Sequence, residues 1–260
     1  MPHFLLECCV DSPESALAAA QNGADRLELC ADLLVGGTTP SHGLFELVKR
    51  RVKIPVNVLL RPRFGDFCYT GLEFEVLLAD AARFAAAGAD GLVLGVLTPD
   101  GELDEPRMER LIAAAHGLPV TLHRAFDVCR DPFAALRAAK ALGVSSILTS
   151  GQAAAAPQGT DLLAELVRQA GPANILVGGG VNSGNLAALA AATGRLDILH
   201  TPEMEETIIR AGKAWGLIDG GHFVSNTNID GIPLEGVKAV VQLLYTITAQ
   251  FYDTTPMTHP

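Results

Sequence analysis

The sequence predicts a single-domain α/β protein whose residues 1–260 form a closed (β/α)8 TIM barrel. Alanine-rich helical stretches alternate with short apolar, β-branched runs along most of the chain, which is typical of repeated βα units around a parallel sheet. Eight such units fit in about 250 residues, the usual size of this barrel. No Ser/Gly-rich linker or block of charge marks a domain boundary.

The eight predicted strands are short and almost wholly apolar inside. They are Phe4–Cys8, Arg26–Leu29, Val56–Leu60, Leu92–Val96, Val120–His123, Ser146–Thr149, Asn174–Val177 and Leu196–Leu199. A glycine that ends a helix precedes every second strand, at Gly23, Gly88, Gly143 and Gly194. Helix starts are marked by Ser12 before Pro13, Asp104 near Pro106 and Asp131 before Pro132.

Residues 1–200 hold all eight units, and residues 201–260 end in a final helix with apolar residues at helical spacing. An open, doubly wound sheet is the alternative fold. It usually has fewer strands and a phosphate-binding turn after strand one, where this chain has Glu7, Cys8 and Cys9. The closed barrel is therefore the preferred prediction.

The composition of the chain disfavours several classes of binding partner. Hydrophobic residues make up 49% of the chain, and 19 Lys and Arg against 29 Asp and Glu give a net charge of −10. An acidic surface disfavours nucleic acid and anionic lipid. We expect a cytoplasmic protein without a membrane partner, because no apolar run approaches the ~20 residues of a spanning helix and no secretory signal is visible. The five cysteines are then expected to be reduced thiols.

Ionisable and thiol side chains gather near the predicted carboxyl ends of the strands. In barrels of this kind that rim carries the functional site. A network of ion pairs that merely closes the mouth of the barrel is the alternative explanation. The residues concerned are Glu7, Glu28, Cys30, Arg61, Arg63, His123, Arg124, Asp127 and His200.

The segment Leu60–Phe67 carries the most specific local pattern. Arg61 and Arg63 lie two residues apart on an extended chain, so their guanidinium groups are predicted to converge on a carboxylate or phosphate. They could equally pair with Glu7 and Glu28 of neighbouring strands. Anion binding is slightly favoured.

The fifth predicted strand ends in His123 and Arg124, and Asp127 follows. Histidine is suited to moving a proton near neutral pH, and Asp127 could fix its tautomer. We therefore predict His123, assisted by Asp127 or Glu7, as a catalytic group. A hydrogen-bonded core histidine is the structural alternative.

Small residues follow the sixth and seventh strands. Ser150 ends one, and Gly179 and Gly180 precede a helix that begins near Ser183, where backbone amides could approach an anion beside Arg124. A tight turn is the alternative explanation for the glycines.

All five thiols lie at or just beyond predicted strand ends. Alternation along the strands places Cys9 and Cys30 on one face of adjacent strands, close enough to bind Cu(I) together. No C-x-x-C or H-x-x-x-H spacing supports a metal site, so the sequence alone favours buried cysteines that act as small hydrophobes.

Taken together, these motifs closely resemble the CutC family of copper homeostasis proteins over about residues 4–200. They are Glu7–Ser12, Asn22–Cys30, Gly36–Ser41, Arg61–Arg63, Gly65–Phe67, His123–Asp127 and Leu148–Gly151. The resemblance implies a cytosolic, usually oligomeric (β/α)8 barrel linked to copper, with no established reaction. The chain departs from the family pattern after His200, where Thr201, Pro202 and Glu203 follow.

Two functions follow from this reading. The first is copper homeostasis, with Cu(I) bound through Cys9 and Cys30. The second is an enzyme acting on a small anionic metabolite, gripped by Arg61 and Arg63, with His123 as the proton carrier. The sequence does not decide whether the protein is an enzyme.

Overall fold

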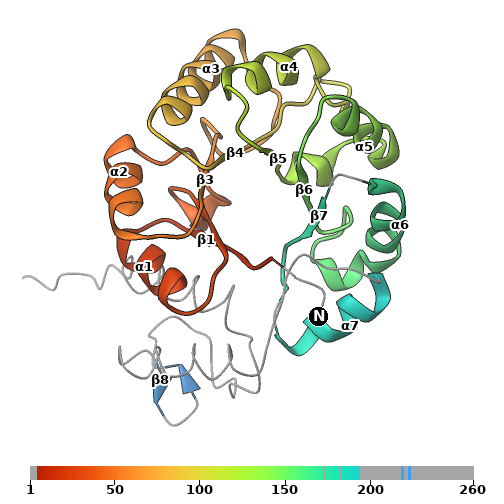
Figure 1. Cartoon of the computed structure of the whole chain (residues 1–260). Helices are drawn as coiled ribbons and strands as arrows, with labels where there is room; N and C mark the ends of the chain where they lie inside the picture. Colours follow the sequence, from red (N-terminus) through yellow and green to blue (C-terminus); the bar gives the residue numbers. More distant parts are fainter. Residues whose placement is uncertain (1–4, 172–173, 182, 194–217, 220–221, 224–260) are drawn as a thin grey trace, which may run out of the picture.

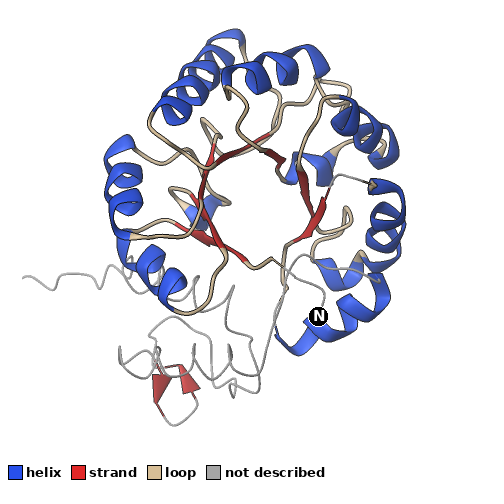
Figure 2. Ribbon diagram, viewed as in Figure 1, coloured by secondary structure: helices blue, strands red, loops and turns tan. Residues whose placement is uncertain are grey.

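The computed structural model describes residues 5–171, 174–181, 183–193, 218–219 and 222–223. Seven strands form one parallel sheet in the order β1 to β7, each paired with its neighbour in sequence. Figure 1 shows these strands in a ring with the helices outside it, and Figure 2 shows the same arrangement by element type. The strands are β1 (Glu7–Val10), β2 (Arg26–Leu29), β3 (Val56–Leu59), β4 (Gly91–Leu94), β5 (Val120–Leu122), β6 (Ser146–Thr149) and β7 (Asn174–Val177).

An α-helix follows each of these strands, and the first six helices return the chain to the start of the next strand. The helices are α1 (Pro13–Gln21), α2 (His42–Arg51), α3 (Gly71–Ala86), α4 (Glu105–Ala114), α5 (Pro132–Ala141), α6 (Thr160–Ala170) and α7 (Ser183–Thr193). Short 3₁₀ turns are η1 (Leu33–Val35), η2 (Arg124–Val128) and η3 (Ala156–Gln158). A two-residue pair, β8 (Ile218–Asp219) with β9 (His222–Phe223), stands apart from the sheet.

Helix starts agree with the residues that predicted them. Ser12 caps α1 and exchanges hydrogen bonds with Ser15, and Asp131 accepts two backbone hydrogen bonds at the start of α5. Asp104 caps α4 in the same way. Such caps satisfy amide groups that have no partner within the helix. No described helix is long and apolar enough to cross a bilayer.

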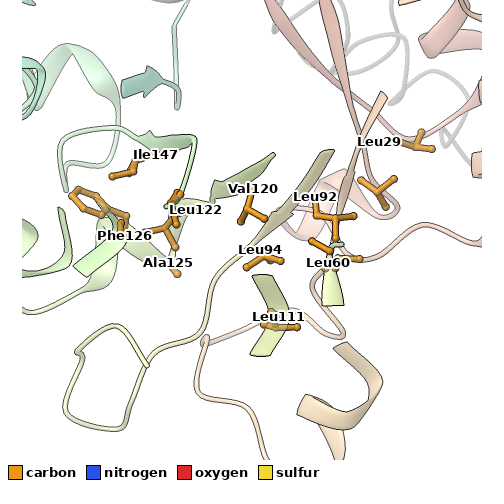
Figure 3. Packing of buried hydrophobic residues seen from close by; sticks show 14 of the residues in the cluster. Leu29, Leu60, Leu92, Leu94, Leu111, Val120, Leu122, Ala125, Phe126 and Ile147 are labelled. Carbon is orange, nitrogen blue, oxygen red and sulfur yellow. The ribbon is translucent and has the colours of Figure 1, made fainter. Parts of the chain in front are cut away.

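The outer face of the sheet is apolar and packs against the helices. Alternate residues of each strand, such as Leu27, Leu29, Val56, Val58, Leu92 and Leu94, are fully buried there. Figure 3 shows part of this layer, from Leu29 to Ile147. The residues between them point to the inner face, because strand side chains alternate. The hydrophobic layer therefore supplies most of the packing, and the inner face carries polar groups beside a small apolar cluster of Cys30, Leu33, Leu59 and Val93.

Three strands, β2, β6 and β7, begin and end at the predicted residues. The first strand is different. It was predicted as Phe4–Cys8, but β1 begins at Glu7 and pairs it with Arg26, the first residue of β2. Glu7 therefore lies at the amino end of its strand and not at the rim. The predicted eighth strand, Leu196–Leu199, and the predicted final helix lie outside the described residues.

Candidate functional site

The inner face of the sheet carries most of the polar residues singled out from the sequence. The strand pairing aligns Glu7 with Arg26, Cys9 with Glu28, and Glu28 with Asn57, so these side chains share one face. Cys30, Arg61 and His123 extend that face beyond the ends of β2, β3 and β5, as the two-residue alternation continues. Most of these groups are buried, so each needs a partner or a function.

A pair of carboxyl groups forms the lower part of this face. Glu7 forms an ion pair with Arg26 and accepts a hydrogen bond from Asn57 Nδ2 at 3.3 Å. The Glu28 carboxyl, 5% exposed, bonds to Glu7. Burial, followed by the charge of Glu7, raises the pKa of Glu28 to about 8. Glu28 is therefore mostly protonated at neutral pH, beside the Glu7 carboxyl group, whose pKa is also raised by burial.

The two thiols predicted to approach each other do so. Cys9 and Cys30 are close enough for each thiol to shift the pKa of the other, and Cys30 Sγ lies 3.6 Å from Glu28 Oε1. The Cys30 thiol lowers the pKa of Cys9, but burial and the neighbouring carboxyl groups outweigh it, so this pKa is raised overall. The Cys9 thiol, together with burial, raises the pKa of Cys30 well above its ordinary value. Both sulfurs are protonated at neutral pH.

Cys9 differs from its neighbours in being accessible to solvent. Part of its surface reaches solvent, although enough protein atoms surround the sulfur for desolvation to raise its pKa, whereas Cys8 on the opposite face is 3% exposed among the residues that face the helices. Solvent therefore reaches the Cys9–Cys30 pair from the inner side of the sheet. The other two thiols, Cys68 and Cys129, belong to loops after β3 and β5 and are not part of this pair.

Arg61 and Arg63, which were predicted to converge, have different environments. Arg61 is 8% exposed and donates to the carbonyls of Gly37 (3.0 Å) and Gly65 (2.9 Å). Arg63 is partly exposed and ion-paired with Asp66 and with Glu73 near the start of α3. The chain turns outward after Pro62, so the extended geometry behind the prediction does not continue. Only Arg61 stays on the inner face.

His123 is 4% exposed and lies beside Arg61. Its Nδ1 accepts the backbone N–H of Ala125 at 3.2 Å, which leaves its proton on Nε2. Burial, then the nearby charge of Arg61, lowers the pKa of His123 to about 3. The imidazole is therefore neutral near pH 7 and suited to donating a hydrogen bond. Its predicted role as a proton carrier stays a prediction.

Asp127 does not orient His123, as the sequence had suggested. It accepts hydrogen bonds from Arg124 Nε (2.7 Å), the Ser150 backbone amide (3.0 Å) and the Thr149 hydroxyl. Arg124 Nη2 in turn donates to Ser150 Oγ at 2.9 Å. Asp127 therefore joins the segment after β5 to the end of β6.

The predicted anion-binding group of Arg124, Ser150, Gly179 and Gly180 is partly assembled. A Cβ on Gly179 would lie 3.2 Å from Ser150 Cβ and 3.4 Å from Arg124 Cζ, so these residues pack together. Gly179 and Gly180 both have positive φ, at 92° and 70°, which explains the glycines as a tight turn. The charge of Arg124 is balanced by Asp127. Arg61 is therefore the stronger candidate for binding an anion.

Sequence reasoning missed three residues of the site. Arg26 pairs with Glu7, Asn57 bonds to Glu7, and the Phe67 ring lies against both Arg61 and His123. The sequence does distinguish Asn57, because it is the one polar residue in the run Val56–Leu59. Phe67 lies in a loop whose path the sequence does not specify. Within the described part of the chain, no group of three or more His, Cys, Asp or Glu side chains is arranged to hold a metal.

Comparison with known proteins agrees with this geometry. The model of the CutC family matches residues 4–204, which is most of the chain. The chain belongs to the CutC family. A human protein named copper homeostasis protein cutC homolog is 48% identical over 192 residues, covering 74% of this chain and 70% of its own. A CutC family protein of Chromobacterium violaceum is 46% identical over 194 residues, covering 74% and 78%.

A solved structure extends the comparison to three dimensions. The putative copper homeostasis protein CutC from Streptococcus agalactiae superimposes with a TM-score of 0.70 at 34% identity, covering 74% of this chain and 95% of its own. The matched region of the CutC family model contains every residue of the inner face described above. The resemblance first read from short motifs is thus confirmed across the strands that carry the site.

Proposed function

We propose that this CutC-family chain acts in copper homeostasis by binding Cu(I) between Cys9 and Cys30. The observation that carries the proposal is the placement of these two thiols on one face of adjacent strands, where Cys9 pairs with Glu28 two residues before Cys30 and is reached by solvent. Thiolates are soft ligands that select Cu(I), and two of them are enough for a linear complex. The names of the human and Streptococcus relatives point to the same metal.

The chemistry of the pair fits a metal that is taken up and released. Both sulfurs carry protons at neutral pH, so binding must displace them, and competition with protons weakens the complex. Because Glu28 is itself mostly protonated at neutral pH, the displaced thiol protons pass to the solvent that reaches Cys9. This arrangement suits transfer of Cu(I) better than permanent storage.

The test is a Cu(I) titration under anaerobic, reducing conditions, in competition with bicinchoninate. We expect one Cu(I) per chain in the wild type and at least a hundredfold weaker binding in the C9S/C30S double variant. Cys8→Ser is the matched control, because Cys8 is the next residue on the same strand but faces the helices. Equal affinities in the wild type and the double variant would refute the proposal.

The remaining features of the proposed protein follow from the same reading. We propose that Leu196–Leu199 supplies an eighth strand between β7 and β1, the two edges of the described sheet, to complete a single (β/α)8 domain. The acidic charge supports a protein that binds neither nucleic acid nor membrane, and we propose a cytoplasmic location on the family resemblance. A homo-oligomer is proposed on the family resemblance, and sedimentation velocity would test it.

A further inference from the structure

Arg61 is a buried cation without a counter-ion in the described part of the chain. Its Nη1 and Nη2 donate to the carbonyls of Val35, Gly37 and Gly65, at 3.3, 3.0 and 2.9 Å, and none of its nitrogens lies within ion-pair distance of a described carboxylate. Its Nε is buried and has no acceptor. Buried charges are normally paired, because burial without an opposite charge costs several kcal/mol. A group of opposite charge would therefore be strongly favoured beside Arg61.

His123 offers a second unused donor next to it. The bond from Ala125 to Nδ1 fixes the proton on Nε2, and Nε2 is buried with no hydrogen-bond partner. Leaving a buried donor unpaired costs about 1–3 kcal/mol. The inner face thus holds two neighbouring N–H groups, one cationic and one neutral, that both lack acceptors.

One aromatic ring covers both donors. The Phe67 ring centroid lies 4.8 Å from that of His123 and 5.0 Å from Arg61 Cζ. Phe67 is only partly buried and belongs to the loop between β3 and α3, which has no regular secondary structure from Arg61 to Thr70. The Phe67 ring attracts the Arg61 cation through a cation–π interaction. It has no acceptor atom for the N–H groups that lie in the planes of the guanidinium and the imidazole. The Leu97 amide holds the Phe67 carbonyl at 3.0 Å, so a rotation of the Phe67 side chain, and not a shift of the loop, would replace the ring by a ligand.

We propose that Arg61 and His123 form a binding site for the carboxylate group of a small metabolite, with Phe67 as its movable cover. The site lies on the same face as the Cys9–Cys30 pair and extends the function beyond copper. Its two donors come from different strands and would meet one oxygen each of a planar carboxylate.

Charge balance favours a carboxylate over a phosphate. Within the described residues, Arg61 is a cation of the inner face that has no carboxylate within ion-pair distance, whereas Glu7 and Arg26 pair with each other and Asp11 accepts the Leu33 amide. A carboxylate cancels the remaining charge of Arg61. A phosphate dianion would leave one negative charge buried and unpaired, at a large desolvation cost.

The test measures thermal unfolding of the full chain at pH 7.5 and constant ionic strength, with sodium acetate, sodium pyruvate or sodium phosphate added. We expect acetate or pyruvate to raise Tm in a saturable way, and phosphate to do so less. Arg61→Gln should abolish the rise. Arg63→Gln is the matched control, because it removes the same charge from the same loop and should leave the rise unchanged.

Arg61 also donates hydrogen bonds to three loop carbonyls, so Arg61→Gln removes structural bonds as well as the charge. A second variant that leaves these bonds in place keeps the proposal testable if Arg61→Gln does not fold. His123→Phe keeps Arg61 and replaces an unpaired donor by an apolar ring; we expect it to fold and to bind the carboxylate at least tenfold more weakly. In wild-type protein labelled with ¹⁵N-histidine, the Nε2 resonance of His123 should move as pyruvate or acetate is added. The C9S/C30S variant should respond as the wild type does, which separates this site from copper binding.

Three results would each overturn the proposal. One is that neither carboxylate raises Tm nor moves the Nε2 resonance. Another is that phosphate stabilises the protein more than both carboxylates do. The last is that folded Arg61→Gln and His123→Phe variants keep the full response.

Discussion

Replacing Glu28 by Gln should make the protein more stable at alkaline pH and leave its stability near pH 5 almost unchanged. The pKa of Glu28 is raised from the ordinary value of 4.5 to about 8, chiefly by burial. The folded state therefore holds a proton that the unfolded state loses between these two values. The contribution of this bound proton to the free energy of unfolding is fully present below pH 4.5 and is lost as the pH rises through about 8.

The magnitude follows from the interval between the two pKa values. It spans about 3.5 pH units, and roughly 1.4 kcal/mol for each gives a loss of about 5 kcal/mol at pH 9, as an upper limit. Relaxation around the pair with Glu7 reduces it. A glutamine amide can donate to Glu7 as the protonated carboxyl does, but it does not titrate. The variant should therefore gain several kcal/mol over the wild type at pH 9.

The assay is urea unfolding of the wild type and Glu28→Gln at pH 5, 6, 7, 8 and 9, in the presence of a reductant. The difference between the two proteins isolates Glu28, because His123 and the other titrating groups are common to both. Glu75→Gln, on the exposed side of α3, is the control and should follow the wild type at every pH. A difference that stays constant from pH 5 to 9 would refute the reasoning.

Three further predictions test other parts of the site. Asp127→Ala should cost about 3–5 kcal/mol of unfolding free energy by urea denaturation, because it leaves Arg124 without its partner and removes the bonds to Thr149 and Ser150; a loss below 1 kcal/mol would contradict this. Gly95→Ala should cost about 1–3 kcal/mol, because its Cβ would lie 2.8 Å from His123 Cε1, whereas Gly71→Ala meets nothing within 4 Å and should be nearly neutral. Equal melting temperatures for the two glycine variants would count against the packing described here. Cu(I) affinity should rise with pH between 6.5 and 8.5, by up to about tenfold per pH unit for each thiol proton displaced, in the same bicinchoninate competition. An affinity independent of pH would exclude ligation by these protonated thiols.

The proximity of Cys9 and Cys30 could be predicted because it depends on little. Two strands adjacent in a parallel sheet and a two-residue alternation are enough to place both sulfurs on one face, and both conditions are met. The position of Glu7 could not be predicted in the same way, because it depends on where strand pairing begins. An apolar run such as Leu5–Leu6 does not reveal where pairing starts, and that was decided by the alignment of Glu7 with Arg26.

Loop geometry explains the other differences. The prediction that Arg61 and Arg63 converge assumed that the extended chain continues, but Gly65 takes a φ of 98° and the segment turns towards α3. Glu73 and Asp66 then neutralise Arg63. The position of Phe67 over His123 depends on the same turn. Contacts made by loops depend on the folded chain as a whole, so short sequence patterns do not specify them.

Cys8 and Cys9 point to opposite faces of the sheet, so a single strand serves both packing and binding. Every second position of β1 contributes to the hydrophobic layer, and the positions between contribute to chemistry. Substitutions at Cys9 can therefore alter what the protein binds with little loss of packing, whereas those at Cys8 or Val10 alter its stability first. A slip of one residue in strand pairing would exchange the two sets, so correct register is itself a condition for activity.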